Sequence, residues 1–207
     1  FEAMNKAGVP VVLFDCIPNS KDFHYVACNM VSGTVQAISY LLKGGHRAIG
    51  LINGPEKLFA SKERLQGYQL AMSKHRLKYD PSLIVNTDLS EQGNYDATAL
   101  LLLSKRKITA IVAFNDYVAL DAMHYTNQKN IRVNKDIVFV SYANLPMMHY
   151  LKYSPVASVE QHPYQQGQKA AEIMIELLHK KEDDNNQDEV FSAITIDSKL
   201  VVYTKHK

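Results

Sequence analysis

The sequence has 207 residues, of which 46% are hydrophobic and 21% charged, and its formal net charge is +2. This length allows one large domain or two small ones, and the small net charge argues against a nucleic-acid-binding surface on this chain. The two cysteines, Cys16 and Cys28, lack metal-ligand spacing and a disulfide framework, which favours a reducing compartment. We find no signal peptide and no apolar run long enough for a membrane span.

The first residues are typical of the end of a helix over residues 1–6, with Gly8 just after it. A buried strand is expected over residues 9–14, ending at Asp15. A chain that begins on the last turns of a helix lacks what precedes it, so we expect a portion of a longer protein. A second strand over residues 25–28 leads into a helix that ends at Gly44-Gly45. The apolar stripe expected on that helix consists of Val31, Val35, Ile38 and Leu42.

The segment from Gly44 to Met72 reads as a strand, a loop and a helix. The apolar run 48–52 shows no alternation, as expected of a parallel strand covered on both faces, and Asn53-Gly54-Pro55 ends it. Ser61 is the expected N-cap of the next helix. The apolar side chains that recur at helical spacing on this helix are Leu65, Tyr68 and Met72.

Arg64 then falls in the first turn of that helix, where the helix dipole disfavours a cation. Ligands of open α/β sheets bind beyond the carboxyl ends of the strands, which is where this loop points. We therefore consider Arg64 a candidate ligand contact. The alternative is a surface arginine paired with Glu56 or Glu63.

The remainder of the chain repeats the alternation of strands and helices, which implies parallel pairing. We expect strands at residues 83–85, 108–114, 136–142, 156–160, 190–196 and 199–203. Helices are expected from a Ser90 cap to Leu103, from an Asn115-Asp116 cap to Lys129, and from Pro163 to His179, followed by a charged loop over 180–189. The inward residues of the last helix are Ala170, Ile173, Met174 and Leu177.

Motifs for catalysis are absent from the sequence. The eight histidines form no HExxH pattern, and the sequence lacks a GxSxG elbow, a GxxxxGK[ST] loop and a GxGxxG turn. We therefore expect no enzyme, no metal site and no cofactor. The alternative is an α/β enzyme that uses Asp15 or Asp116 as a base, which would need a nucleophile or metal constellation that we do not find.

A polar residue recurs just past most of the strands. If the strands are parallel, these residues meet at one edge, where they can hydrogen-bond sugar hydroxyls or a purine. Each also has an ordinary structural explanation: Asp116 and Ser61 as helix caps, Asp15 as a cap or turn residue, and Gln161 as a partner of hinge backbone. The residues concerned are Asp15, Ser61, Arg64, Asn115, Asp116, Asn144 and Gln161.

Six segments, in this order and spacing, resemble the effector-binding region of LacI/GalR-type bacterial transcription repressors. They are GVPVVLFD, LLKGGHRAIGLINGP, SKERLQGYQLAM, ITAIVAFNDYVALDAM, IRVNKDIVFVSYANLP and SPVASVEQHPYQQGQKAAEIMIELL. The resemblance covers nearly the whole chain from Gly8 to about Leu178. It is most specific in the GHR to GY block and in the FND block.

The resemblance implies an α/β fold of the periplasmic binding protein type I-like class, with parallel sheets flanked by helices. It implies two subdomains joined by three crossovers, with a small ligand in the cleft. Residues 1–28 and 162–192 are the expected amino-terminal subdomain, which is incomplete. Residues 29–161 are the expected carboxyl-terminal subdomain, and residues 193–207 form a crossover and terminal strands. The helix-turn-helix headpiece of the family lies upstream and is absent from this sequence.

Carried over by position, Arg64 matches the cleft arginine of the family, Asp15 an acidic cleft-edge position, Asn115 a ligand-binding amide and Gln161 a cleft residue on a crossover. The sequence departs from the family at Ala143, where an aspartate is usual, and at Leu89, where several members have a stacking aromatic. Both departures weigh against a standard pyranose. The expected ligand-binding set is Asp15, Ser61, Arg64, Leu89, Asn115, Ala143 and Gln161.

The helix 117–129 and the segment 147–153 resemble the dimer-forming surface of the family. The alternative is a hydrophobic loop packed on its own domain. The expected interface residues are Tyr117, Leu120, Met123, Tyr150, Leu151 and Tyr153.

These observations predict the ligand-sensing part of a cytoplasmic, homodimeric regulator. It would bind a sugar-like or nucleoside-like effector and contact operator DNA only through its headpiece. The alternative is an exported solute-binding protein of a sugar transporter, which shares the fold.

Overall fold

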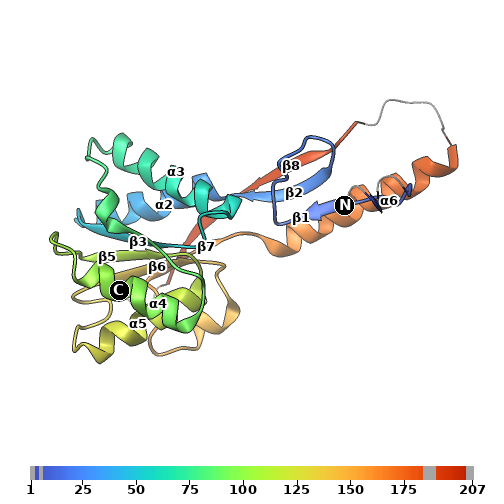
Figure 1. Ribbon diagram of the computed structural model, residues 1–207. Helices are drawn as coiled ribbons and strands as arrows, with labels where there is room; N and C mark the ends of the chain where they lie inside the picture. Colours follow the sequence, from blue (N-terminus) through green and yellow to red (C-terminus); the bar gives the residue numbers. More distant parts are fainter. Residues whose placement is uncertain (1–2, 5–6, 184–189, 204–207) are drawn as a thin grey trace. The chain divides into compact units, whose positions relative to one another are not determined.

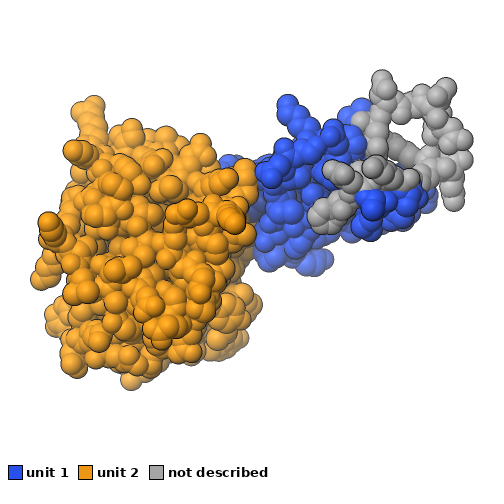
Figure 2. Space-filling view, in the orientation of Figure 1, with its two compact units in different colours: residues 1–29, 162–197 blue, residues 30–161, 198–207 orange. Residues whose placement is uncertain are grey.

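The structure is a computed structural model that describes residues 3–4, 7–183 and 190–203. It contains two compact units, coloured separately in Figure 2. Unit 1 comprises Phe1–Asn29 and His162–Asp197, and unit 2 comprises Met30–Gln161 and Ser198–Lys207. The chain therefore passes from one unit to the other three times.

Unit 1 is built on a parallel sheet of three strands in the order β1-β2-β8. The strands are β1 (Val12–Phe14), β2 (His24–Asn29) and β8 (Ala193–Asp197). The long helix α6 (Pro163–Asp183) packs against β1 and β2. Of its expected inward face, Ile173 is buried and the other three residues are half-buried.

The prediction of a buried first strand is wrong. Val12 and Leu13 of β1 are half-buried, and Phe14 is 47% exposed. Among the described residues β1 pairs only with β2, so it is an edge strand, and α6 covers one face of it at most. A run of apolar residues indicates a strand, whereas its burial depends on what lies against it.

Both ends of unit 1 carry further expectations. Gly8 has φ +68°, and Val9 N–H donates to Met4 O at 3.0 Å, as expected just after a helix. Residues 1–2 and 5–6 of that helix lie outside the described residues. The charged loop expected from residue 180 begins later, because α6 continues to Asp183, and residues 184–189 of it are also outside the described part.

Unit 2 is built on a six-stranded sheet in the order β4-β3-β5-β6-β7-β9. Neighbouring strands from β4 to β7 are parallel, and β9 is antiparallel to β7. The predicted α/β fold with predominantly parallel sheets is confirmed. The strands are β3 (Ile49–Asn53), β4 (Ile84–Asn86), β5 (Ala110–Ala113), β6 (Val138–Tyr142), β7 (Ala157–Glu160) and β9 (Lys199–Val202).

Helices cover both faces of this sheet (Figure 1). On one face lie α2 (Met30–Lys43) and α3 (Phe59–Lys74), and on the other α4 (Glu91–Leu102) and α5 (Asp116–Gln128). Every residue of β3 and β5 is buried as a result, which agrees with their unbroken apolar runs. Short 3₁₀ turns at Pro81–Leu83 and Pro146–His149 precede β4 and follow β6.

The core between the sheet and the helices α4 and α5 brings strand and helix side chains together. Ile111 and Phe139 from the strands pack with Leu101, Val118 and Met123 from the helices. On the other face, the stripe predicted for α2 is rotated, because Val31 and Val35 are only half-buried. The side chains that α2 buries are those of Met30, Thr34, Ala37, Ile38, Leu41 and Leu42.

Two of the three predicted helix caps are confirmed. Ser90 Oγ accepts from Gly93 N–H at 3.0 Å, and Asn115 Oδ1 accepts from Val118 N–H at 2.9 Å. The prediction for Ser61 is wrong, because α3 begins at Phe59 and its N-cap is Leu58, which makes no side-chain cap bond. Within the described residues no helix is long and apolar enough to span a bilayer, and Cys16 and Cys28 do not form a disulfide.

The exposed apolar residues of unit 1 predict self-association of this chain. Val9, Phe14 and Val190 are 44%, 47% and 83% exposed, and an edge strand with exposed apolar side chains promotes pairing between molecules. We expect light scattering of the 207-residue chain to show a mass above that of a monomer at tens of micromolar. Phe14→Ser should lower that mass, whereas Leu103→Ser on unit 2 serves as a matched exposed control. A strictly monomeric wild type contradicts the prediction.

Candidate functional site

Five parallel strands of unit 2 end at one edge of the sheet. The pairs Asn53–Asn86, Ile52–Ala113, Val112–Val140 and Tyr142–Val159 fix this common edge. Side chains that follow the strands therefore meet there. We call this edge the rim and define it by Asn53, Gly54, Ser61, Arg64, Thr87, Leu89, Phe114, Asn115, Ala143, Asn144 and Gln161.

Arg64 is buried within the rim, with only 3% of its surface exposed. Its guanidinium carbon lies 4.1 Å from the ring centroid of Phe114 and 4.4 Å from that of Tyr142. Contacts of this kind with aromatic faces contribute about 0.5 to 2 kcal/mol each, the larger value when the cation is desolvated. Nη1 donates to Ala60 O at 3.1 Å. The two rings thus fix the guanidinium plane.

The position of Arg64 on its helix differs from our expectation. Because α3 begins at Phe59, Arg64 lies in the second turn and not in the first. It is four residues before Tyr68 and eight before Met72, both of which are buried, and residues at this spacing share a helix face. Arg64 therefore continues the buried stripe of α3. The same helical pattern in the sequence could have placed it on that face.

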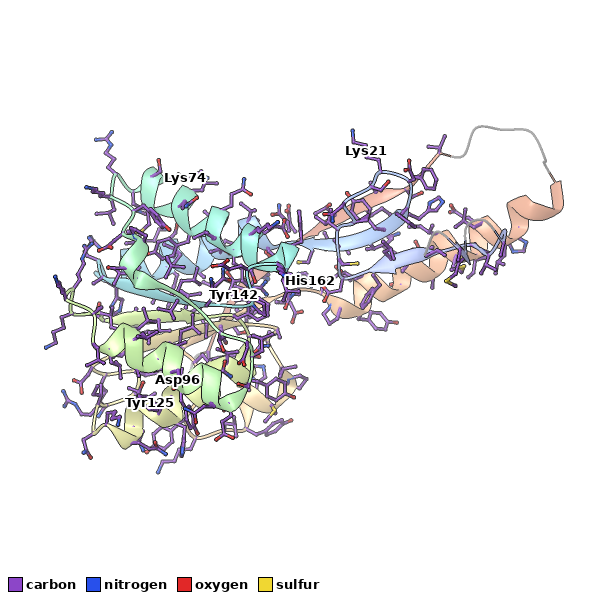
Figure 3. The ribbon with its side chains drawn as sticks, in the orientation of Figure 1. Lys21, Lys74, Asp96, Tyr125, Tyr142 and His162 are labelled. Carbon is purple, nitrogen blue, oxygen red and sulfur yellow. The ribbon has the colours of Figure 1, made fainter. Side chains whose placement is uncertain are left out.

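Tyr142 is held in place by a hydroxyl on α2. Its phenolic oxygen shares a hydrogen bond with Thr34 Oγ1, which also donates to Met30 O at 2.8 Å. Burial raises the pKa of Tyr142 to about 12, and the nearby charge of Arg64 offsets part of this effect. Tyr142 is therefore neutral at physiological pH. Figure 3 shows Tyr142 near the start of α3 and Lys74 at the other end of that helix.

The second ring against Arg64 requires a glycine beside it. A Cβ at Gly54 would lie 2.6 Å from Phe114 Cε2, so no other residue fits there without moving the ring. Gly54 belongs to the Asn53-Gly54-Pro55 turn of the sequence. The turn thus ends β3 and also leaves space for the aromatic side chain that follows β5.

The buried rim atoms Ser61 Oγ and Asn53 Oδ1 have no hydrogen-bond partner among the described residues. Ser61 and Asn53 are 1% and 3% exposed, and Asn53 Nδ2 donates to Ser61 O at 3.0 Å. A buried polar group without a partner costs about 1 to 3 kcal/mol. A polar ligand or water at the rim would remove this cost.

Asp116 organises the strand ends and is not the simple helix cap that the sequence suggested. It is fully buried, and its Oδ1 accepts from the hydroxyls of Ser141 and Ser158, on β6 and β7. Its Oδ2 accepts from Leu145 N–H at 2.7 Å. Burial raises the pKa of Asp116, while these hydrogen bonds oppose the rise. The role of the two serines was not predicted, although a polar residue within each buried strand is a signal that could have indicated it.

The segment after β6 has an unusual backbone. Ala143 has φ +95° and Asn144 has φ +50°. Residues other than glycine rarely adopt positive φ angles. Ala143 N–H donates to Val159 O at 3.0 Å, and Asn144 N–H donates to Ser158 Oγ at 3.0 Å. Asn144 also donates through Nδ2 to Glu160 Oε2 at 2.8 Å. Hydrogen bonds to the neighbouring strand therefore hold this strained segment at the rim.

The remaining predicted ligand residues divide between the two units. Leu89 has φ +71° and is 37% exposed in the loop after β4, and Gln161 Nε2 lies 3.6 Å from Met30 Sδ. Asn115 uses its oxygen for the cap, and its Nδ2 has no partner among the described residues. Asp15 belongs to unit 1, where it follows β1 and accepts from Gln166 Nε2 at 3.4 Å. Unit 2 thus brings together all the predicted ligand residues except Asp15.

The predicted interface residues are only partly accessible. Tyr117, Tyr150 and Tyr153 are 60%, 88% and 64% exposed. Leu120 and Leu151 are half-buried. Met123 is corrected from an interface residue to a core residue, because it is 4% exposed and packs inside the α4 and α5 core.

Comparison with known proteins decides the family. The model of the periplasmic binding protein-like domain matches residues 38–196. The chain belongs to this family. No group of three or more histidine, cysteine, aspartate or glutamate side chains that could hold a metal occurs in the described part of the chain.

Transcription regulators of the LacI type are similar to this chain. The repressor PurR of Vibrio cholerae is 31% identical over 180 residues, which cover 84% of this chain and 52% of PurR. PurR of Vibrio parahaemolyticus is 29% identical over 196 residues, covering 92% of this chain and 57% of that protein. The chain thus spans about half the length of these curated relatives.

Solved structures agree with this assignment. The transcriptional regulator CelR in its cellobiose complex superposes with a TM-score of 0.85 at 25% identity, covering 96% of this chain and 59% of CelR. A LacI-family regulatory protein from Chloroflexus aggregans gives 0.83 at 28% identity, covering 97% and 70%. The predicted LacI/GalR-type effector-binding region is confirmed.

The backbone of Ala143 leads to a stability prediction. Because glycine adopts φ near +95° without steric cost, Ala143→Gly should raise the free energy of unfolding by about 1 kcal/mol. Ala170→Gly, at a half-buried position inside α6, should lower it by a similar amount. Urea unfolding followed by circular dichroism measures both. A destabilised Ala143→Gly variant contradicts the backbone assignment.

Proposed function

We propose that this chain is the ligand-sensing domain of a cytoplasmic bacterial transcription regulator and is not an enzyme. It binds a small sugar-like or nucleoside-like effector at the rim of unit 2. The effector alters operator binding by a helix-turn-helix headpiece outside these 207 residues. The similarity to PurR and CelR supports the regulator assignment, and the cellobiose of the CelR complex supports a sugar-like ligand.

The observation that carries this proposal is the surroundings of Arg64. The rim places a guanidinium between two aromatic rings, beside the partnerless atoms Ser61 Oγ and Asn53 Oδ1. A site of this kind offers charged and neutral hydrogen bonds against an apolar wall, as small-molecule sites do. Asn115 Nδ2 adds a further donor, and Asp15 of unit 1 remains a predicted contact.

Recognition at this rim differs from that of a site with a free carboxylate. Ala143 supplies no side-chain acceptor, and both oxygens of Asp116 are engaged by protein donors. The available groups on unit 2 therefore include a donor, Asn115 Nδ2, an acceptor, Asn53 Oδ1, and the hydroxyl of Ser61, which can do either. This set suits a ligand that carries both hydroxyl donors and acceptor oxygens or ring nitrogens. Effector binding couples to operator binding when the two protein states bind the effector with different affinity, typically by about 1 to 3 kcal/mol.

Calorimetry of the full-length protein against a panel of sugars and nucleosides tests the site. Arg64→Lys keeps the charge but loses the planar contact with both rings, so it should weaken binding about tenfold or more. Arg132→Lys is the matched control, since Arg132 is exposed and pairs with Asp136. Wild-type affinity in Arg64→Lys would refute the site assignment.

The same regulator is proposed to act as a homodimer through the surface around Tyr117, Tyr150 and Tyr153. Large exposed aromatic side chains of this kind are enriched at protein interfaces. Tyr150→Ser combined with Tyr117→Ser should raise the dimer dissociation constant of the full-length protein at least tenfold in sedimentation experiments. Tyr164→Ser, at a residue of unit 1 that is 84% exposed, should leave it unchanged. Equal effects of both changes argue against this surface.

A further inference from the structure

A chain of hydrogen bonds inside unit 2 links the rim to the outer helix pair. Leu89 N–H donates to Thr87 Oγ1 at 3.1 Å, and Thr87 Oγ1 donates to Asn94 Oδ1 at 2.7 Å. Asn94 Nδ2 then donates to Asp121 Oδ2 at 2.8 Å. The bonds run from the loop after β4 through α4 to α5. We call this series the relay.

The centre of the relay is buried. Thr87 is 6% exposed and Asn94 is 1% exposed. Each bond in such a place is costly to break, because the groups left behind have no access to water. Asn94 uses its amide oxygen toward the rim and its amide nitrogen toward α5, so one side chain joins both ends.

The loop at the rim end is packed closely onto the start of α4. Asp88 Oδ1 accepts from Ser90 N–H at 2.9 Å. A Cβ at Gly93 would lie 2.1 Å from that same oxygen and 3.0 Å from Thr87 Oγ1. Leu89 keeps its left-handed backbone, φ +71°, between these contacts. The loop therefore has little freedom to move without moving Thr87.

The other end of the relay leads to an exposed surface. Asp121 follows Tyr117 by four residues on α5, so the two share a helix face, and Tyr117 is 60% exposed. Asp121 is half-buried, and Asn94 is its hydrogen-bond partner among the described residues. Figure 3 shows Asp96 of α4 and Tyr125 of α5 on the same side of the sheet, where the two helices pack together.

We propose that Asn94 is a positioning residue that couples the Leu89 loop of the rim to α5 through the relay. When the loop shifts, Thr87 changes its bond to Asn94, and the change reaches Asp121 without passing through the sheet. This coupling rests on the proposed function, in which the rim around Leu89 binds the effector and Tyr117 of α5 contacts a second subunit. The relay itself needs neither ligand nor dimer to be measured.

Amide hydrogen exchange of the 207-residue chain, followed by NMR, tests the relay. Asp121→Ala removes the acceptor at the α5 end of the relay, and Asp121 makes no hydrogen bond to Leu89 itself. If the relay transmits the change, amide exchange at Leu89 should become about three- to tenfold faster relative to a β5 amide. Asn94→Leu should speed it at least as much. Asp96→Ala is the matched control, because Asp96 also lies on α4 but has the exposed Gln92 as its side-chain hydrogen-bond partner among the described residues.

The outcomes separate clearly. Leu89 exchange within twofold of wild type in Asp121→Ala overturns the relay, as does an equal effect of Asp96→Ala. If Asn94→Leu does not fold, Asn94→Asp provides the second variant. It keeps an acceptor for Thr87 but places a carboxylate against Asp121, so it should also speed exchange. A failed relay leaves the calorimetric test of Arg64 unaffected, and a failed Arg64 test leaves this one unaffected.

Discussion

The burial of one cation constrains the rest of unit 2. A guanidinium removed from water is costly unless its surroundings compensate, and Arg64 is 3% exposed. The compensation comes from aromatic faces at the ends of two strands, Phe114 after β5 and Tyr142 in β6. Those rings in turn require Gly54 on one side and the hydroxyl of Thr34 on the other. A single side chain thus ties together α2, α3 and three strand ends.

Asp116 performs the complementary task with a buried carboxyl group. Its two oxygens accept bonds from β6, from β7 and from the backbone after β6. These bonds hold the positive φ angles of Ala143 and Asn144 at the rim. The aromatic contacts of Arg64 and the hydroxyl contacts of Asp116 therefore fix the same strand ends from different directions. Such a preorganised edge suits binding, because little ordering is left to be done when a ligand arrives.

Local signals in the sequence were sufficient for much of the architecture. The caps Ser90 and Asn115 accept hydrogen bonds from amides three residues ahead. Both partners of each bond therefore lie within one short stretch of sequence. The unbroken apolar runs of β3 and β5 likewise indicate strands covered on both faces. The resemblance to a known family supplied most of the predicted ligand residues, and unit 2 gathers all of the predicted ligand residues except Asp15.

What the sequence could not supply depends on distant partners. The serines that bond to Asp116 lie 25 and 42 residues away, so the residue looked like a cap. Ser61 was misread because the helix starts at Phe59, at an N-cap with no side-chain bond. Met123 was assigned to the interface because its helix resembles the dimer-forming surface of the family, whereas its side chain packs in the core between α4, α5 and the sheet. For β1, burial depended on which elements lie against it.

The three passages of the chain between units have a consequence for biosynthesis. Nearly all of unit 2 lies in one continuous stretch, Met30–Gln161, whereas unit 1 takes its strands from both sides of that stretch. During translation the central sheet of β3 to β7 leaves the ribosome before α6 and β8 exist. The described sheet of unit 1 is therefore completed only after β8 has been synthesised, and β9, which follows β8 in the chain, then pairs with β7 at the edge of unit 2. The pairing of β2 with β8 thus forms after the central strands of unit 2 have been made.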